Sequence, residues 1–144
     1  MGTVKVPIGP NDTTGLVHDR LLEAGKHLLV DTVHALADGT ANPVPQNELM
    51  PHDGPIKEAP KLFKEHGKID WNKDARAIHN QIRGLNPFPG AWTTLPDGGT
   101  LRVHESLEVD AEFGGAPGTV HMSKNELVVQ LSLIHISEPT RRPI

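Results

Sequence analysis

The longest periodic stretch of hydrophobic residues lies near the beginning of the chain. Apolar side chains recur there at spacings of three and four, from Val17 to Leu36, which is the pattern of a helix with one apolar face. Asp12 or Thr13 can cap the start of such a helix through a side-chain oxygen, and Gly39 can end it by adopting a positive φ. The pattern therefore predicts a helix of about two dozen residues.

The segments on either side of this predicted helix have different patterns. Residues 4–8 are a short β-prone run that ends among prolines and a glycine, which indicates the tail of a strand entering a turn. Residues 40–60 contain five prolines and little periodicity, which is typical of a stiff connector. We therefore expect a domain boundary within residues 40–60.

A second amphipathic pattern lies between Asn72 and Gly84. Asparagine is a favourable N-cap of a helix, and glycine commonly ends one. Four apolar residues fall in one arc of a helix drawn at 100° per residue: Ala75, Ile78, Ile82 and Leu85. The opposite side carries Lys73, Arg76, Asn80 and Arg83. We expect a helix that packs through one face and presents a basic face to its surroundings.

Two pairs of short β-prone runs follow this second helix. Residues 91–95 and 100–109 flank the sequence Pro-Asp-Gly-Gly, and residues 118–123 and 126–130 flank Lys-Asn. Short connections of this composition are typical of hairpin turns. The pattern predicts two hairpins, as in the opening of a small antiparallel barrel.

Composition excludes several classes of protein. The 144 residues include no cysteine, which excludes disulfides and thiolate chemistry and fits a reducing cytoplasm. The apolar runs are short, so we expect no membrane span. The nine histidines show no paired spacing within a carboxylate-rich frame, so we expect no metal site.

Charge is distributed unevenly along the chain. The net charge is −4, yet residues 56–84 carry seven Lys/Arg against four Asp/Glu and lie between two acidic segments. A basic segment of this kind is where a polyanionic partner would make contact. A solvated helix face is the simpler interpretation of the same residues, and composition alone does not name a partner.

Three motifs within and just after the basic segment resemble those of a known family. They read Ala-Pro-Lys-Leu-Phe-Lys at residues 59–64, Ile-Asp-Trp-Asn at 69–72 and Ile-Arg-Gly-Leu-Asn-Pro-Phe-Pro-Gly-Ala-Trp at 82–92. In this order and spacing they resemble the linker and the start of the C-terminal domain of methionyl-tRNA formyltransferases. Upstream, residues 6–21 resemble the last strand and helix of that family's catalytic domain, and residues 116–120 resemble a turn of its barrel.

The resemblance implies an α/β plus β architecture in four segments. Residues 1–42 would be the last strand and helix of a Rossmann-like formyltransferase domain, and residues 43–68 a proline-rich linker. Residues 69–130 would be a helix and the first strands of an incomplete OB-like barrel. Residues 131–144 depart from the family and resemble a translated sequencing adapter, so we expect this last segment to be an artefact.

The resemblance also implies a reaction. The family transfers a formyl group from 10-formyltetrahydrofolate to the amino group of initiator methionyl-tRNA in translation initiation. Its asparagine, histidine and aspartate around the folate cleft all precede the strand that begins near Val4, so we assign no catalytic residue here. We expect this chain by itself to be inactive and to bind no folate.

Two other functional interpretations remain open at this point. The chain could derive from a different formyltetrahydrofolate-dependent enzyme, either a sugar-amine formyltransferase or a formyltetrahydrofolate dehydrogenase, since both share the domain pair. It could also be a non-catalytic RNA-binding module. The motif at residues 86–89, together with that at 59–61, favours the tRNA enzyme.

The candidate site is a set of six basic residues that would contact RNA. Lysines and arginines displace counterions from phosphates and position a nucleic acid without reading much of its sequence. We interpret Trp71 and Trp92 as core anchors rather than as platforms for base stacking. The six RNA-binding candidates are Lys61, Lys64, Lys68, Lys73, Arg76 and Arg83.

Overall fold

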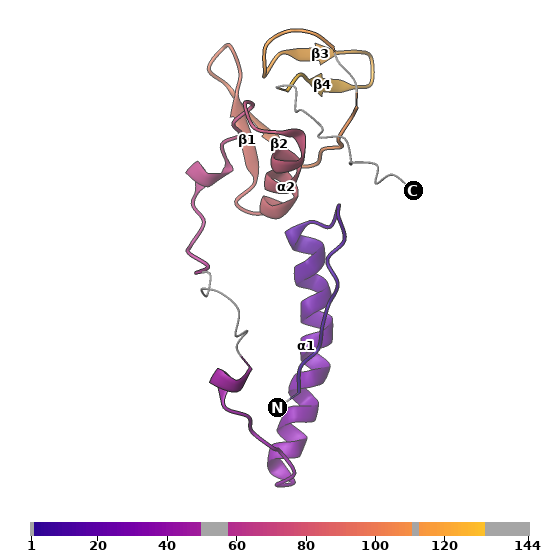
Figure 1. The fold of residues 1–144 in the computed structure, drawn as a ribbon, viewed down its shortest axis with the longest axis vertical. Helices are drawn as coiled ribbons and strands as arrows, with labels where there is room; N and C mark the ends of the chain where they lie inside the picture. Colours follow the sequence, from indigo (N-terminus) through magenta and orange to yellow (C-terminus); the bar gives the residue numbers. More distant parts are fainter. Residues whose placement is uncertain (1, 50–57, 111–112, 132–144) are drawn as a thin grey trace, which may run out of the picture. The chain divides into compact units, whose positions relative to one another are not determined.

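The chain divides into two units, residues 1–63 and residues 64–144. The computed structural model describes residues 2–49, 58–110 and 113–131 (Figure 1). Among these residues, the first unit contains the long helix α1 and a short 3-10 turn, η1 (Gln46–Glu48). The second unit contains a 3-10 turn, one helix and two β-hairpins.

The helix α1 (Thr14–Ala37) has the predicted length and ends. It contains 24 residues, and the Thr13 side chain caps it by accepting a hydrogen bond from the Leu16 backbone N–H at 3.3 Å. Asp38 is the C-cap, and Gly39 follows with φ +69°, a conformation that glycine adopts without steric cost. The prediction of this helix from its periodicity and its end signals is confirmed.

The apolar face of α1 is only partly covered within the described part of its unit. None of its residues is buried, but Val17, Ala24 and Leu28 are half-buried, and its other large apolar side chains are about half exposed or more. The exposed ones are Leu16, Leu21, Leu22, Leu29, Val30, Val33 and Leu36.

The strand tail predicted at residues 4–8 is wrong. No strand is assigned anywhere in residues 2–9, and the described residues of this unit contain no strand that could pair with them. A β-prone run becomes a strand only when a neighbouring strand accepts and donates the backbone hydrogen bonds. The connector that follows α1 contains only η1 among its described residues, and residues 50–57 lie outside them.

The helix α2 (Ala75–Leu85) differs from its prediction at both ends. Its N-cap is Asp74, whose Oδ1 accepts a hydrogen bond from the Ala77 N–H at 2.6 Å. Asn72, the predicted cap, instead donates through its backbone and its side-chain amide to Asp70 Oδ1, at 3.1 and 3.0 Å. The predicted stop at Gly84 is also wrong, because the helix continues through that residue to Leu85.

The end of α2 follows from the proline after it rather than from the glycine inside it. The C-cap Asn86 has φ −87° and ψ 128°, which is the extended conformation that a following proline favours. The Asn86–Pro87 and Phe88–Pro89 peptide bonds are both cis. The chain then enters β1 at Ala91.

The core of the second unit is small and centred on α2. The predicted apolar arc is confirmed, since Ile78, Ile82 and Leu85 are buried and Ala75 is half-buried. Ile82, which is 2% exposed, packs in a cluster with Ile69 and Ala91. This cluster connects α2 to the first strand and to the segment that follows the 3-10 turn η2 (Lys64–Gly67).

The two predicted hairpins are confirmed. β1 (Ala91–Thr94) pairs antiparallel with β2 (Thr100–Val103), and β3 (Val120–Met122) pairs antiparallel with β4 (Leu127–Val129). They form two separate two-stranded sheets within the described residues.

The second run was predicted to reach residue 109, but β2 ends at Val103. The residues after β2 bond to α2 and its C-cap instead of to a strand. Asn86 Nδ2 donates to the His104 carbonyl at 2.8 Å, and His79 Nδ1 lies 3.0 Å from Ser106 Oγ. These side-chain contacts take the place of a longer strand ladder.

Replacing Asp74 with alanine should destabilise the second unit by about 1 kcal/mol, because the Ala77 N–H loses its capping oxygen. Denaturant unfolding followed by tryptophan fluorescence measures this, since both tryptophans, Trp71 and Trp92, lie in the second unit. Asn72→Ala is the matched control and should lower the free energy of unfolding by less. Equal losses for the two variants would contradict the assignment of the cap.

Two glycines provide a second matched pair. A Cβ at Gly67 would lie against the Gly90 carbonyl oxygen, closer than real Cβ atoms approach, whereas a Cβ at Gly84 would meet nothing within 4 Å. We therefore expect Gly67→Ala to destabilise the unit by about 1–3 kcal/mol through overpacking. Gly84→Ala should stabilise it by about 0.5–1 kcal/mol by removing glycine from a helix. The same unfolding measurement shows whether Gly67→Ala lowers the free energy of unfolding and whether Gly84→Ala raises it.

Candidate nucleic-acid interface

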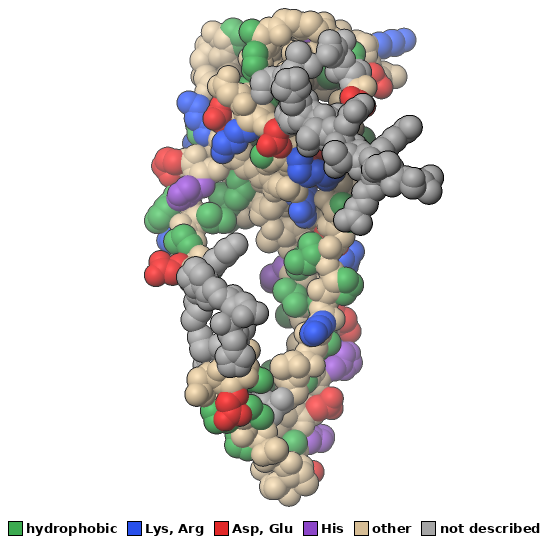
Figure 2. Space-filling model, viewed as in Figure 1, with side chains coloured by type: hydrophobic (Ala, Val, Ile, Leu, Met, Phe, Trp, Pro, Cys, Tyr) green, Lys and Arg blue, Asp and Glu red, His purple; other side chains and the backbone are tan. Residues whose placement is uncertain are grey.

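The six basic candidates lie in different parts of the chain. Lys61 belongs to the first unit, and the other five belong to the second. Lys64 is in η2, Lys68 follows it, Lys73 lies in the turn before α2, and Arg76 and Arg83 are in α2. Figure 2 shows Lys and Arg side chains interspersed with Asp and Glu over the second unit. Four of the five are exposed, and Arg83 is half-buried.

Trp92 brings two of the candidate lysines together. The ammonium groups of Lys64 and Lys68 each lie 5.8 Å from the centroid of the Trp92 ring, within the range of a cation–π interaction. The Trp92 indole N–H donates to the Lys64 carbonyl at 2.9 Å, and the Ile69 N–H donates to the Trp92 carbonyl at 2.8 Å. The sequence interpretation of Trp92 as a core anchor missed this role, because the partners lie 24 and 28 positions away.

The turn that carries these lysines is also bonded to α2. Gln81 Nε2 donates to the carbonyl oxygens of His66 and Lys68, at 3.0 and 3.1 Å. Gly67 is buried between them and allows the backbone to approach Gly90. The backbone on either side of Lys64 and Lys68 is therefore held by the first strand and by the helix.

The basic face predicted for α2 is only partly correct. Lys73 precedes the N-cap and so is not a residue of the helix. Arg76 and Arg83 are in α2, seven residues apart, which places them about two turns apart on one side. Arg76 Nη1 forms an ion pair with Glu108 Oε1 at 2.9 Å, and Arg83 Nε donates to Asn80 Oδ1 at 2.8 Å.

Acidic groups reduce the positive charge of this surface. Residues 64–83 carry five Lys/Arg against three Asp/Glu, a net charge of +2. Hydrogen bonds from the Asn72 backbone and side chain hold the pKa of Asp70 below its ordinary value. This carboxylate therefore stays charged beside Lys73 as the pH falls toward the ordinary range for aspartate. The local charge is positive but moderate.

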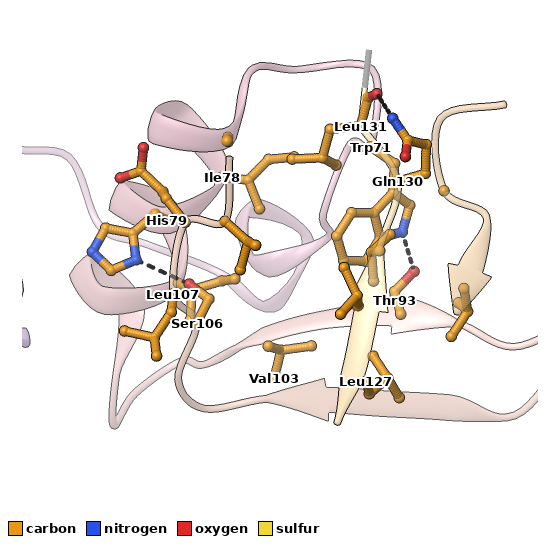
Figure 3. A pocket seen from close by; sticks show the side chains of 18 of the residues that line it. Trp71, Ile78, His79, Thr93, Val103, Ser106, Leu107, Leu127, Gln130 and Leu131 are labelled. Carbon is orange, nitrogen blue, oxygen red and sulfur yellow. Dashed lines mark hydrogen bonds between the residues drawn. The ribbon is translucent and has the colours of Figure 1, made fainter. Parts of the chain in front are cut away.

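A pocket of about 1360 Å³ opens among α2 and the two hairpins (Figure 3). Its lining is mostly apolar, and several of its polar groups bond to one another. The Trp71 indole N–H donates to Thr93 Oγ1 at 3.0 Å, and buried His79 pairs with Ser106. The volume exceeds the roughly 300–1,000 Å³ of most small-molecule sites. We interpret this space as part of the hydrophobic interior that the described strands leave open.

The pairing of His79 with Ser106 was not predicted from the sequence. His79 lies three residues before Ile82, so its place beside the apolar arc is a signal that could have identified it as buried. Ser106 falls in the part of the predicted second strand that is not a strand. Its position could not be read from strand alternation.

Metal-binding clusters and membrane-spanning helices are both absent from the described residues. Residues 2–49, 58–110 and 113–131 contain no group of three or more His, Asp or Glu side chains placed to hold a metal ion. Neither described α-helix has the length and apolar character needed to cross a membrane.

Part of the chain matches a known family of domains. Residues 61–134 match the family described as formyl transferase, C-terminal domain, which is just over half of the chain. The match ends inside the segment 131–144, which was expected to be an artefact. Of that segment only Leu131 is among the described residues, and it packs against the core.

Several bacterial relatives carry the name methionyl-tRNA formyltransferase. The protein from Phocaeicola vulgatus is 43% identical over 111 residues, which cover 76% of this chain and 34% of that protein. The protein from Bacteroides fragilis is 37% identical over 121 residues, which cover 81% of this chain and 37% of that protein. The protein from Desulforamulus reducens is 37% identical over 132 residues, covering 87% and 38%.

This chain thus spans between a third and two fifths of the length of these curated relatives. The family match covers all of α2 and both hairpins. The chain belongs to the formyl transferase family, in which residues 61–134 are the C-terminal domain.

Proposed function

We propose that this chain is part of a cytoplasmic methionyl-tRNA formyltransferase that acts in translation initiation. The reaction transfers a formyl group from 10-formyltetrahydrofolate to the amino group of initiator methionyl-tRNA. Support comes from relatives of that name, which are 37–43% identical over at least three quarters of this chain. Their shared name also favours this enzyme over a sugar-amine formyltransferase or a formyltetrahydrofolate dehydrogenase.

The finer architecture is part of the same proposal. Residues 1–42 would be the end of a Rossmann-like catalytic domain, residues 43–68 the linker and residues 69–130 the start of an OB-like barrel. The exposed leucines of α1 support the first assignment, because a helix of an α/β domain covers a sheet with its apolar face. The open apolar pocket supports the last, because a barrel fills its interior with side chains from strands that close it.

Within that enzyme, we assign to this chain the holding of RNA rather than the chemical step. The observation that carries this assignment is the cluster of exposed cations around η2 and α2. Lys64 and Lys68 have no carboxylate partner within the part of the chain that the structure describes. Such groups neutralise backbone phosphates and position the acceptor arm for formylation.

Neutralising three of the candidates together should weaken binding to an initiator tRNA transcript and make its salt dependence shallower. For Lys73→Gln/Arg76→Gln/Arg83→Gln, the slope of log K against log salt should fall by roughly one for each phosphate that the variant no longer neutralises. Because Arg76 already pairs with Glu108, we expect less than the full change of about three. Titration of the 144-residue chain at several salt concentrations measures the slope.

The matched control removes three lysines outside the candidate surface: Lys5, Lys26 and Lys124. These side chains are exposed, and the control lowers the net charge by the same amount. If the control reduces the slope as much as the candidate variant does, binding depends on total charge and the assigned surface is incorrect.

A further inference from the structure

The pair Lys64 and Lys68 is arranged differently from the two candidate arginines of α2. Arg76 is bonded to a carboxylate and Arg83 to a side-chain amide. The two lysines instead share one aromatic ring, each with its ammonium 5.8 Å from the Trp92 centroid. A cation over an aromatic face keeps its charge and its N–H donors, so both ammonium groups remain able to bind an anion.

The backbone around this pair is fixed by contacts from two directions. Trp92 bonds through its indole N–H to the Lys64 carbonyl, and Lys68 forms an isolated parallel bridge with Trp92. Gln81 reaches from α2 to the Lys68 carbonyl. The starting points of both lysine side chains are therefore set, and the ring restricts where their ends can go.

This restriction bears on anion binding because a lysine normally loses much rotamer freedom when it binds a phosphate. Two ammonium groups already gathered on one ring lose less of that freedom. They also bring a combined charge of +2 to the neighbourhood of one ring. A nucleobase, in contrast, would have to displace at least one ammonium before it could stack on a covered face of the ring.

We propose that Trp92 is a positioning residue that holds Lys64 and Lys68 together as a paired ammonium site for one phosphate of the RNA backbone. This inference rests on the proposed function, because it presumes that this surface binds RNA. It assigns to Trp92 an effect that acts only through the two lysines.

A double-mutant cycle tests the inference with the 144-residue chain and an initiator tRNA transcript. Lys64→Gln/Lys68→Gln should weaken binding and reduce the salt slope by up to about 2. Trp92→Leu should weaken binding when both lysines are present and have no further effect when they are absent. Trp92→Phe, which keeps an aromatic face, should recover part of the loss.

Each other outcome has a distinct meaning. If Lys64→Gln/Lys68→Gln matches the control Lys5→Gln/Lys124→Gln, the proposed RNA-binding function of this surface fails. The lysine variant could instead weaken binding while Trp92→Leu has no effect, or while Trp92→Leu weakens binding equally with and without the two lysines. In either case the positioning role of Trp92 fails and the RNA-binding function stands.

A spectroscopic measurement keeps the inference testable if Trp92→Leu does not fold. Protons on the ε-carbons of Lys64 and Lys68 should resonate upfield of those of Lys124 in the unaltered chain, because they lie over the indole ring. Trp92→Phe should reduce that difference. Random-coil positions for both lysines in the unaltered chain would overturn the proposal.

Discussion

The packing of α2 against β1 is the contact on which the second unit depends. Ile82 is almost fully enclosed with Ile69 and Ala91, and a lone two-stranded hairpin is only marginally stable in water. The helix supplies the apolar face that the first hairpin needs. The same contact brings Gln81 and Trp92 to η2, so the core and the candidate surface are set by one arrangement.

The amphipathic helix of the first unit has much less cover. Thr13 and Gly39 define the ends of α1, but no residue of the helix is buried. Most helical stability in proteins comes from packing an apolar face rather than from local propensity. Most leucines of α1 are therefore left exposed by the described residues of this unit.

Sequence reasoning identified the elements that local patterns encode. The 3.6-residue period indicated both helices, and the turn residues indicated both hairpins. It failed where two local signals competed: Asp74 rather than Asn72 caps α2, and Pro87 rather than Gly84 ends it. It also could not foresee contacts between distant residues. The pairing of His79 with Ser106 spans 27 positions, and nothing in either local sequence specifies it.

The candidate surface illustrates why charge counts alone are insufficient. The chain has a net charge of −4, yet the Debye length of about 8 Å at physiological ionic strength means that a phosphate responds mainly to charges beside it. What matters is which cations lack carboxylate neighbours. Arg76 lies against Glu108, whereas Lys64 and Lys68 lie against an uncharged ring. Tertiary contacts, rather than the number of basic residues, thus determine which cations of this chain are not already paired with a carboxylate.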